Sequence, residues 1–161
     1  MARRLFRKHP HLPQGIRPRS SGLPRKTALL RILDTNVCID VLRGRAKVVE
    51  RLSSCRPEEC FISVITEFEL FQGADRAPPE RREEERDKVA RFVATLGILP
   101  FDSACVGIAA RINAGLLNQG TPASVTDVMI AATGLRHRWP VVTNNTKDFR
   151  RVDGLVIEDW R

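Results

Sequence analysis

The sequence predicts an α/β fold in three layers, with a central, mostly parallel sheet of about five strands between two layers of helices. Short apolar runs of strand length alternate with longer segments that have helical periodicity. This alternation favours a parallel sheet that is covered on both faces. A chain of 161 residues has room for a single hydrophobic core, and we therefore expect one folded domain over residues 29–161.

The expected elements follow one another through this domain. Strands are predicted at residues 29–34, 60–62, 98–101, 139–142 and 155–157. Helices are predicted from about residue 35 to residue 42, and over residues 46–53, 63–73, 79–96, 103–117 and 124–137. Gly73 is expected to end its helix, because glycine is common where helices terminate. Asp102 or Ser103 is expected to cap the helix that follows it.

Positive charge is concentrated in residues 1–28. This segment holds eight of the 27 basic residues and no acidic residue, whereas residues 29–161 hold 19 basic and 19 acidic residues. It is rich in Arg, Pro, Ser and Gly and has few apolar residues, so we expect it to be disordered. Two interpretations stay open. The segment is either an extension created by an upstream start codon or a basic arm that binds RNA phosphates through Arg3, Arg4, Arg7 and Lys8.

Composition argues against several classes of protein. No apolar run approaches the roughly 20 residues that a membrane helix requires, and the apolar stretch near the amino terminus is too short for a secretory signal. The four cysteines lack CxxC spacing and the three histidines lack HxxxH spacing, which argues against a zinc site. Free thiols are typical of a reducing cytosol, so we expect a cytoplasmic protein with no membrane association.

Acidic residues stand at three comparable places in the predicted fold. Asp34 ends the first strand, Glu67 and Glu69 lie in the first turns of the helix after the second strand, and Asp127 starts a later helix. The carboxyl ends of parallel strands are where α/β proteins bind ligands. Carboxylates without neighbouring His or Cys suit a hard, oxygen-preferring ion, so these residues are candidate ligands for Mg²⁺ or Mn²⁺.

Each of these acids also has a structural interpretation. Asp34 can cap the helix that follows it, although Asn36 can do the same. Thr66 and Glu69 fit a capping box, in which the glutamate binds a backbone amide. Asp127 can complement the dipole of its helix. Spacing alone leaves these alternatives open, and it does not decide whether Glu67 or Glu69 faces a site.

Several short motifs carry a resemblance to a known family. They are Leu33-Asp34-Thr35-Asn36, Ile62-Ser63-Val64-Ile65-Thr66 with Glu69-Leu70 and Gly73-Ala74, Asp127 before Ile130-Ala131-Ala132, Val142-Thr143-Asn144-Asn145-Thr146-Lys147-Asp148-Phe149, and Gly154-Leu155-Val156-Ile157-Glu158-Asp159-Trp160. Each motif is weak alone, but their order and spacing are specific. Over about residues 30–160 the chain resembles PIN-domain ribonucleases, and closely the VapC toxins of bacterial type II toxin–antitoxin pairs.

The resemblance implies a catalytic site. In that family the helix acid stands directly before Leu, which selects Glu69 over Glu67, and the first and third acids match Asp34 and Asp127. These three residues would bind a divalent ion that activates water and polarises the phosphoryl oxygens of RNA.

Supporting residues are implied after the fourth strand. Thr143 is similar to a hydroxyl residue that often faces the metal site in the family. Many PIN domains have a fourth acid in this segment, but here that position is Asn145, which puts a second metal ion in doubt. Asp148 is close in sequence and could take its place.

The implied function is that of a Mg²⁺-dependent endoribonuclease toxin. Its products would carry a 5′-phosphate and a 3′-hydroxyl. VapC-like proteins are typically homodimers, and a cognate antitoxin inserts a segment into the active-site groove, where its Arg could compete for the carboxylates. We expect the apolar contact surface on the helices around residues 46–53 and 64–74.

Three other functions are open from the sequence. One is a PIN-domain RNA-processing nuclease without an antitoxin. Another is a non-catalytic module that binds RNA through the basic arm, which the absence of an acid at Asn145 keeps open. An aspartyl-phosphate phosphohydrolase would need a second Asp two positions after Asp34, and Asn36 argues against it.

Overall fold

The computed structural model describes residues 29–161 as a three-layer α/β/α domain. The predicted basic extension, with its candidate RNA-binding residues Arg3, Arg4, Arg7 and Lys8, lies outside the described residues. At the centre is a five-stranded sheet in the order β3-β2-β1-β4-β5, and every strand pair in it is parallel. The predicted fold class is confirmed, and the sheet is wholly parallel.

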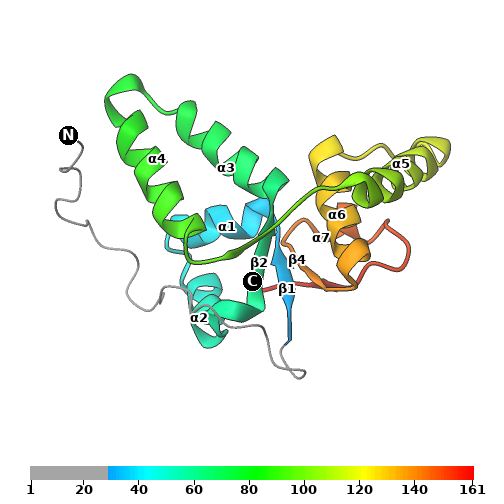
Figure 1. Cartoon of the computed structure of the whole chain (residues 1–161), viewed down its shortest axis with the longest axis horizontal. Helices are drawn as coiled ribbons and strands as arrows, with labels where there is room; N and C mark the ends of the chain where they lie inside the picture. Colours follow the sequence, from blue (N-terminus) through cyan, green and yellow to red (C-terminus); the bar gives the residue numbers. More distant parts are fainter. Residues whose placement is uncertain (1–28) are drawn as a thin grey trace.

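Each strand is separated from the next by one or two α-helices along the described chain (Figure 1). The strands are β1 (Arg31–Leu33), β2 (Cys60–Ser63), β3 (Gly97–Leu99), β4 (Val141–Val142) and β5 (Ile157–Glu158). The helices are α1 (Thr35–Leu42), α2 (Ala46–Ser54), α3 (Val64–Asp75), α4 (Pro79–Val93), α5 (Ser103–Asn118), α6 (Val125–His137) and α7 (Thr146–Phe149), with a 3₁₀ turn at Pro57–Glu59.

One local expectation is wrong and one short helix was missed. Gly73 lies inside α3, which continues to Asp75, and its φ is not positive, so it does not act as a helix terminator. The four-residue helix α7 was not predicted, since one helical turn is too short to show periodicity. Asp102 caps α5, where its carboxylate accepts a hydrogen bond from the Cys105 amide at 2.9 Å.

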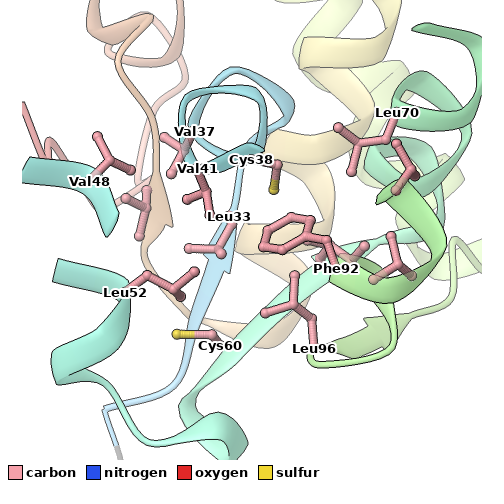
Figure 2. Close-up of a cluster of buried hydrophobic side chains, with 14 of the residues drawn as sticks. Leu33, Val37, Cys38, Val41, Val48, Leu52, Cys60, Leu70, Phe92 and Leu96 are labelled. Carbon is pink, nitrogen blue, oxygen red and sulfur yellow. The ribbon is translucent and has the colours of Figure 1, made fainter. Parts of the chain in front are cut away.

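Alternate residues of each strand face opposite layers, as the period of a strand requires. Leu33 and Ile62 contribute to the core cluster that includes residues of α1, α2, α3 and α4 (Figure 2). Their neighbours Ile32 and Phe61 contribute to the cluster on the other face, which includes residues of α6 and α7. Both faces of the sheet are therefore buried, which explains why the strands read as continuous apolar runs.

The strand order creates a switch point next to β1. From β1 the chain adds β2 and β3 on one side, and then crosses to add β4 and β5 on the other. Ligands of open α/β sheets bind outside the carboxyl ends of the strands at such a point. Asp34 follows β1 and Thr143 follows β4, so both lie at this edge. No helix in the described part of the chain is long and apolar enough to cross a membrane.

Candidate active site

Asp34 is the most buried acid at the switch point, with 1 % of its surface exposed. Its backbone continues the β1–β4 ladder, since the Asp34 amide donates to the Val142 carbonyl at 2.9 Å. One carboxylate oxygen accepts a hydrogen bond from the Thr35 amide at 2.7 Å, and the other accepts from the Thr143 hydroxyl at 2.8 Å. Asp34 is therefore the N-cap of α1, and the candidate cap Asn36 is exposed.

Glu69 reaches the same place from α3. The Thr35 hydroxyl donates a hydrogen bond to the Glu69 carboxylate, which links this acid to the first turn of α1. The N-cap of α3 is Ser63, whose hydroxyl accepts from the Thr66 amide at 3.2 Å. The capping-box interpretation of Thr66 and Glu69 is therefore wrong, because Thr66 lies inside the helix.

Asp127 approaches from α6, where it lies in the first turn. The Asn145 side-chain amide donates to the Asp127 carboxylate at 3.2 Å and to the Asp148 carboxylate at 2.9 Å. The Asn145 backbone amide donates to the Thr143 hydroxyl at 2.9 Å. Because that hydroxyl donates in turn to Asp34, Asn145 connects two of the three candidate ligands.

Asp148 lies on α7 and is held by a cation. The Arg151 guanidinium donates a hydrogen bond to the Asp148 carboxylate and a second one to the Thr121 carbonyl at 3.2 Å. Asp148 is thus already paired with both Arg151 and Asn145. Asp148 is therefore connected to the cluster through Asn145.

Burial and neighbouring negative charges raise the pKa values of two of these carboxyl groups. Burial raises the pKa of Asp34 to about 6, and the charges of Asp127 and Glu69 act in the same direction, while the hydrogen bond from Thr143 opposes them. The pKa of Asp127 is also raised to about 6, first by burial and then by the charges of Glu69 and Asp148. A bound cation would stabilise these three partly buried carboxylates, because it would offset their mutual repulsion.

The donor set fits a hard divalent cation. Asp34, Glu69 and Asp127 offer only oxygen, and no His or Cys side chain contacts them through a hydrogen bond among the described residues. Nowhere in residues 29–161 do three acidic, His or Cys side chains converge closely enough to enclose an ion directly. Mg²⁺ tolerates such spacing, because it keeps several of its waters and is bound through one or two carboxylates.

Comparison with known proteins identifies the family of this chain. The PIN domain family matches residues 31–155. The tRNA(fMet)-specific endonuclease VapC of Shigella flexneri is 37% identical over 131 residues, which cover 80% of this chain and 96% of that protein. The chain is a PIN-domain ribonuclease of the VapC type. Ribonucleases of the PIN family generally depend on divalent metal ions, in agreement with the donor set.

Other relatives match this VapC-type chain over nearly their whole length. The tRNA(fMet)-specific endonuclease VapC of Salmonella typhimurium is 34% identical over 130 residues and matches 80% of this chain and 96% of its own. The crystal structure of DNA-bound VapBC from Salmonella typhimurium superposes with a TM-score of 0.76 at 34% identity, and covers 83% of this chain and 99% of that one.

Sequence reasoning missed two residues of this VapC-type site. Thr35 joins Asp34 to Glu69, and its position between Asp34 and Asn36 in the motif was the available signal. Arg151 neutralises Asp148 from the turn after α7, and no signal existed because α7 itself was not predicted.

Proposed function

We propose that this chain is a Mg²⁺-dependent endoribonuclease that acts in the cytoplasm as the toxin of a VapBC-like toxin–antitoxin pair. The observation that carries the proposal is one hydrogen-bonded cluster at the sheet switch point, which contains Asp34 from the end of β1, Glu69 from α3 and Asp127 from α6. None of these three carboxylates has a cationic partner among the hydrogen bonds and ion pairs of the described residues.

In this proposal the three acids bind the cation directly or through its waters, and the neighbouring residues orient the acids. A bound divalent cation supplies water of lowered pKa and offsets negative charge on the phosphate. Thr143 fixes the carboxylate plane of Asp34, and Thr35 fixes Glu69. Asn145 orients Asp127 without adding a charge, which suits a site for one ion.

A transfer RNA is the first substrate to test. The two relatives named as tRNA(fMet)-specific endonucleases are 37% and 34% identical to this chain over nearly their whole length. We propose cleavage of an RNA phosphodiester that leaves a 5′-phosphate and a 3′-hydroxyl, in the initiator transfer RNA or another structured RNA.

We propose that an antitoxin segment occupies a groove between α1, α3 and α4. The groove has a volume of about 290 Å³, and its lining residues include Ile39, Leu42, Leu70, Val89 and Glu69. Because Glu69 both lines the groove and belongs to the carboxylate cluster, an antitoxin Arg in the groove could pair with it. The expected surface on α2 is less suitable, since its apolar residues Val48 and Leu52 are buried in the core.

The structure matches a solved VapBC complex, which supports an antitoxin partner for this chain. We also propose a homodimer, as expected for a VapC-like protein. Sedimentation of the free chain and of its complex with a cognate VapB-like antitoxin would give both stoichiometries. A free chain that stays monomeric at micromolar concentration would contradict the dimer.

The deciding experiment compares three purified proteins on one substrate. The wild-type chain with Mg²⁺ should cleave initiator transfer RNA, and both Asp34→Asn and excess EDTA should abolish cleavage. Asp75→Asn is a matched control, because Asp75 forms an exposed ion pair with Arg86 outside the cluster. Equal cleavage by Asp34→Asn and wild type would overturn the assignment. Tight RNA binding without cleavage in Mg²⁺ or Mn²⁺ would favour the non-catalytic module.

A further inference from the structure

A second cluster of reactive groups lies at the amino ends of β1 and β2, at the opposite ends of these strands from Asp34 and Ser63. The parallel register places Arg31 opposite Cys60, and Arg31 is only 9% exposed. The Arg31 guanidinium donates a hydrogen bond to the Cys55 sulfur at 3.0 Å. Cys60 lies close enough to Cys55 for each thiol to shift the pKa of the other. Two sulfurs and one buried cation are therefore close neighbours.

Arg31 requires a negative partner. A guanidinium stays charged in proteins, and burial without an anion is costly. The carboxylate of Glu158 lies 3.5 Å from the Arg31 Nε, but this nitrogen makes no hydrogen bond, and Glu158 also accepts from the Trp160 indole at 3.2 Å. The sulfur of Cys55 is the acceptor that Arg31 contacts most closely, so its thiolate would complete the charge balance.

The surroundings of Cys55 favour the thiolate. The pKa of Cys55 is lowered to about 7, first by the hydrogen bond from Cys60 and then by the Arg31 charge, against burial and the charge of Glu59. The pKa of Cys60 is raised by the same hydrogen bond and by burial. In the thiol state Cys55 can instead donate to the Arg51 carbonyl at 3.3 Å.

Access separates Cys55 from the other cysteines. Its side chain is half-buried, whereas Cys38, Cys60 and Cys105 are at most 1% exposed. A reactive cysteine needs both a stabilised thiolate and contact with solvent. Cys55 has both properties, and Cys60 is the neighbouring thiol.

We propose that Cys55 is a peroxide-reactive site and that Cys60 is its resolving thiol. The Cys55 thiolate attacks one oxygen of hydrogen peroxide, the O–O bond breaks, and hydroxide leaves and takes a proton to become water. Sulfur is oxidised to the sulfenic acid while the peroxide is reduced. The Cys60 sulfur then attacks the Cys55 sulfur, the S–O bond breaks, and the Cys60 proton leaves with the hydroxyl group as a second water.

The disulfide would close residues 55–60 around the 3₁₀ turn Pro57–Glu59. It would also remove the anion that faces Arg31, which leaves the carboxylate of Glu158 as the ion-pair partner of this buried cation. The carboxylate cluster lies at the other end of the sheet, so we expect oxidation to change the stability of the domain before it changes the chemistry of the site.

Peptide mapping of the full chain tests the disulfide directly. Trypsin does not cut before proline, and Arg56 precedes Pro57, so Cys55 and Cys60 stay on one peptide from Leu52 to Arg76. After mild peroxide treatment this peptide should lose two hydrogens and regain them with a thiol reductant. In Cys60→Ser the peptide should instead carry a sulfenic acid that dimedone traps. An intact dithiol peptide under these conditions would overturn the proposal.

Alkylation rates test the thiolate independently. At pH 7 the Cys55 of folded protein should react with iodoacetamide about tenfold faster than the same cysteine in urea-unfolded protein. Arg31→Met should raise the pH at which the alkylation rate is half-maximal by about one unit. Arg31→Lys keeps the charge and should raise this pH less. If Arg31→Met does not fold, Arg31→Lys and Cys60→Ala give the same comparison. Equal rates in folded and unfolded wild type would contradict a thiolate at Cys55.

Discussion

Asp34 serves the fold and the site with the same two oxygens. One accepts from the Thr35 amide and starts α1, and the other accepts from Thr143 across the β1–β4 boundary. Neither contact requires a charge, because the amide oxygen of asparagine caps helices equally well and its NH2 group can donate to the Thr143 hydroxyl instead. The charge itself is unfavourable to the metal-free fold, since the pKa of Asp34 is raised to about 6.

We therefore expect Asp34→Asn to remove activity and stabilise the metal-free protein. A raised folded-state pKa means that the contribution of this group to stability is fully present below about pH 4 and is lost as pH rises through 6. Asparagine resembles the protonated form, so the free energy of unfolding at pH 7 in EDTA should rise by about 1–3 kcal/mol. Urea unfolding of both proteins measures the difference.

Asp40→Asn is the matched control for this prediction. Asp40 is also buried, but it accepts from the Asn144 amide at 2.8 Å and from Arg161 at 3.3 Å. Loss of its charge should destabilise the protein by about 1 kcal/mol, because a paired carboxylate is removed. A destabilised Asp34→Asn would show that the charge of Asp34 is already compensated in the metal-free fold.

Metal binding should depend on pH through the same carboxyl groups. The pKa values of Asp34 and Asp127 are both raised to about 6, and a carboxyl must lose its proton to bind a cation. The half-saturating Mg²⁺ concentration should be nearly constant above pH 7 and rise about 10- to 100-fold between pH 7 and pH 5, as one or two protons compete. Mg²⁺ titrations followed by thermal unfolding measure this dependence, and a flat profile down to pH 5 would contradict it.

At the scale of single elements, the short segment between β4 and α7 decides the charge of the site. Asn145 lies between Asp127 and Asp148 and donates one hydrogen bond to each. The neighbouring Asn144 points to a different partner, Asp40, at 2.8 Å. Adjacent residues of the same type therefore serve separate clusters.

The difference between Asn144 and Asn145 allows a test of the position at which many PIN domains have a fourth acid. Asn145→Asp should place a carboxylate against Asp127 and Asp148, lower the midpoint of thermal unfolding in EDTA, and enlarge the stabilisation that Mg²⁺ produces. Asn144→Asp should also lower the midpoint, because it faces Asp40, but should leave the Mg²⁺-dependent shift unchanged. Thermal unfolding with and without Mg²⁺ measures both shifts. Equal enlargement in the two variants would show that the effect is a general response to added charge.

At the scale of the whole molecule, the sequence predicted the strands and long helices, which show periodicity. It did not predict features that depend on contacts between side chains. The order of strands and long helices followed from apolar runs, because both faces of the sheet are buried. The positions of Asp34, Glu69 and Asp127 were predicted, but the choice of Glu69 over Glu67 came from the family resemblance. Arg151 and α7 were missed, because a single turn and an ion pair across it leave no pattern in the sequence.

The uneven charge of the chain yields the last prediction. The described domain, residues 29–161, holds 19 basic and 19 acidic residues, and the remaining eight basic residues lie before it. The domain contains the five-stranded sheet and the three core clusters of the described residues, so a protein that starts at residue 29 should fold.

If the basic segment binds RNA phosphates, its removal should reduce the slope of log affinity against log salt concentration. The expected reduction is about 0.7 for each phosphate that the segment neutralises, while single-turnover cleavage at saturating protein persists. Replacing Arg3, Arg4, Arg7 and Lys8 with Gln in the full chain is the matched control, because it removes charge without changing length. An unchanged salt slope in both proteins would favour an extension without a role in RNA binding, and a loss of cleavage in the truncated protein alone would show that the segment contributes to the site by something other than charge.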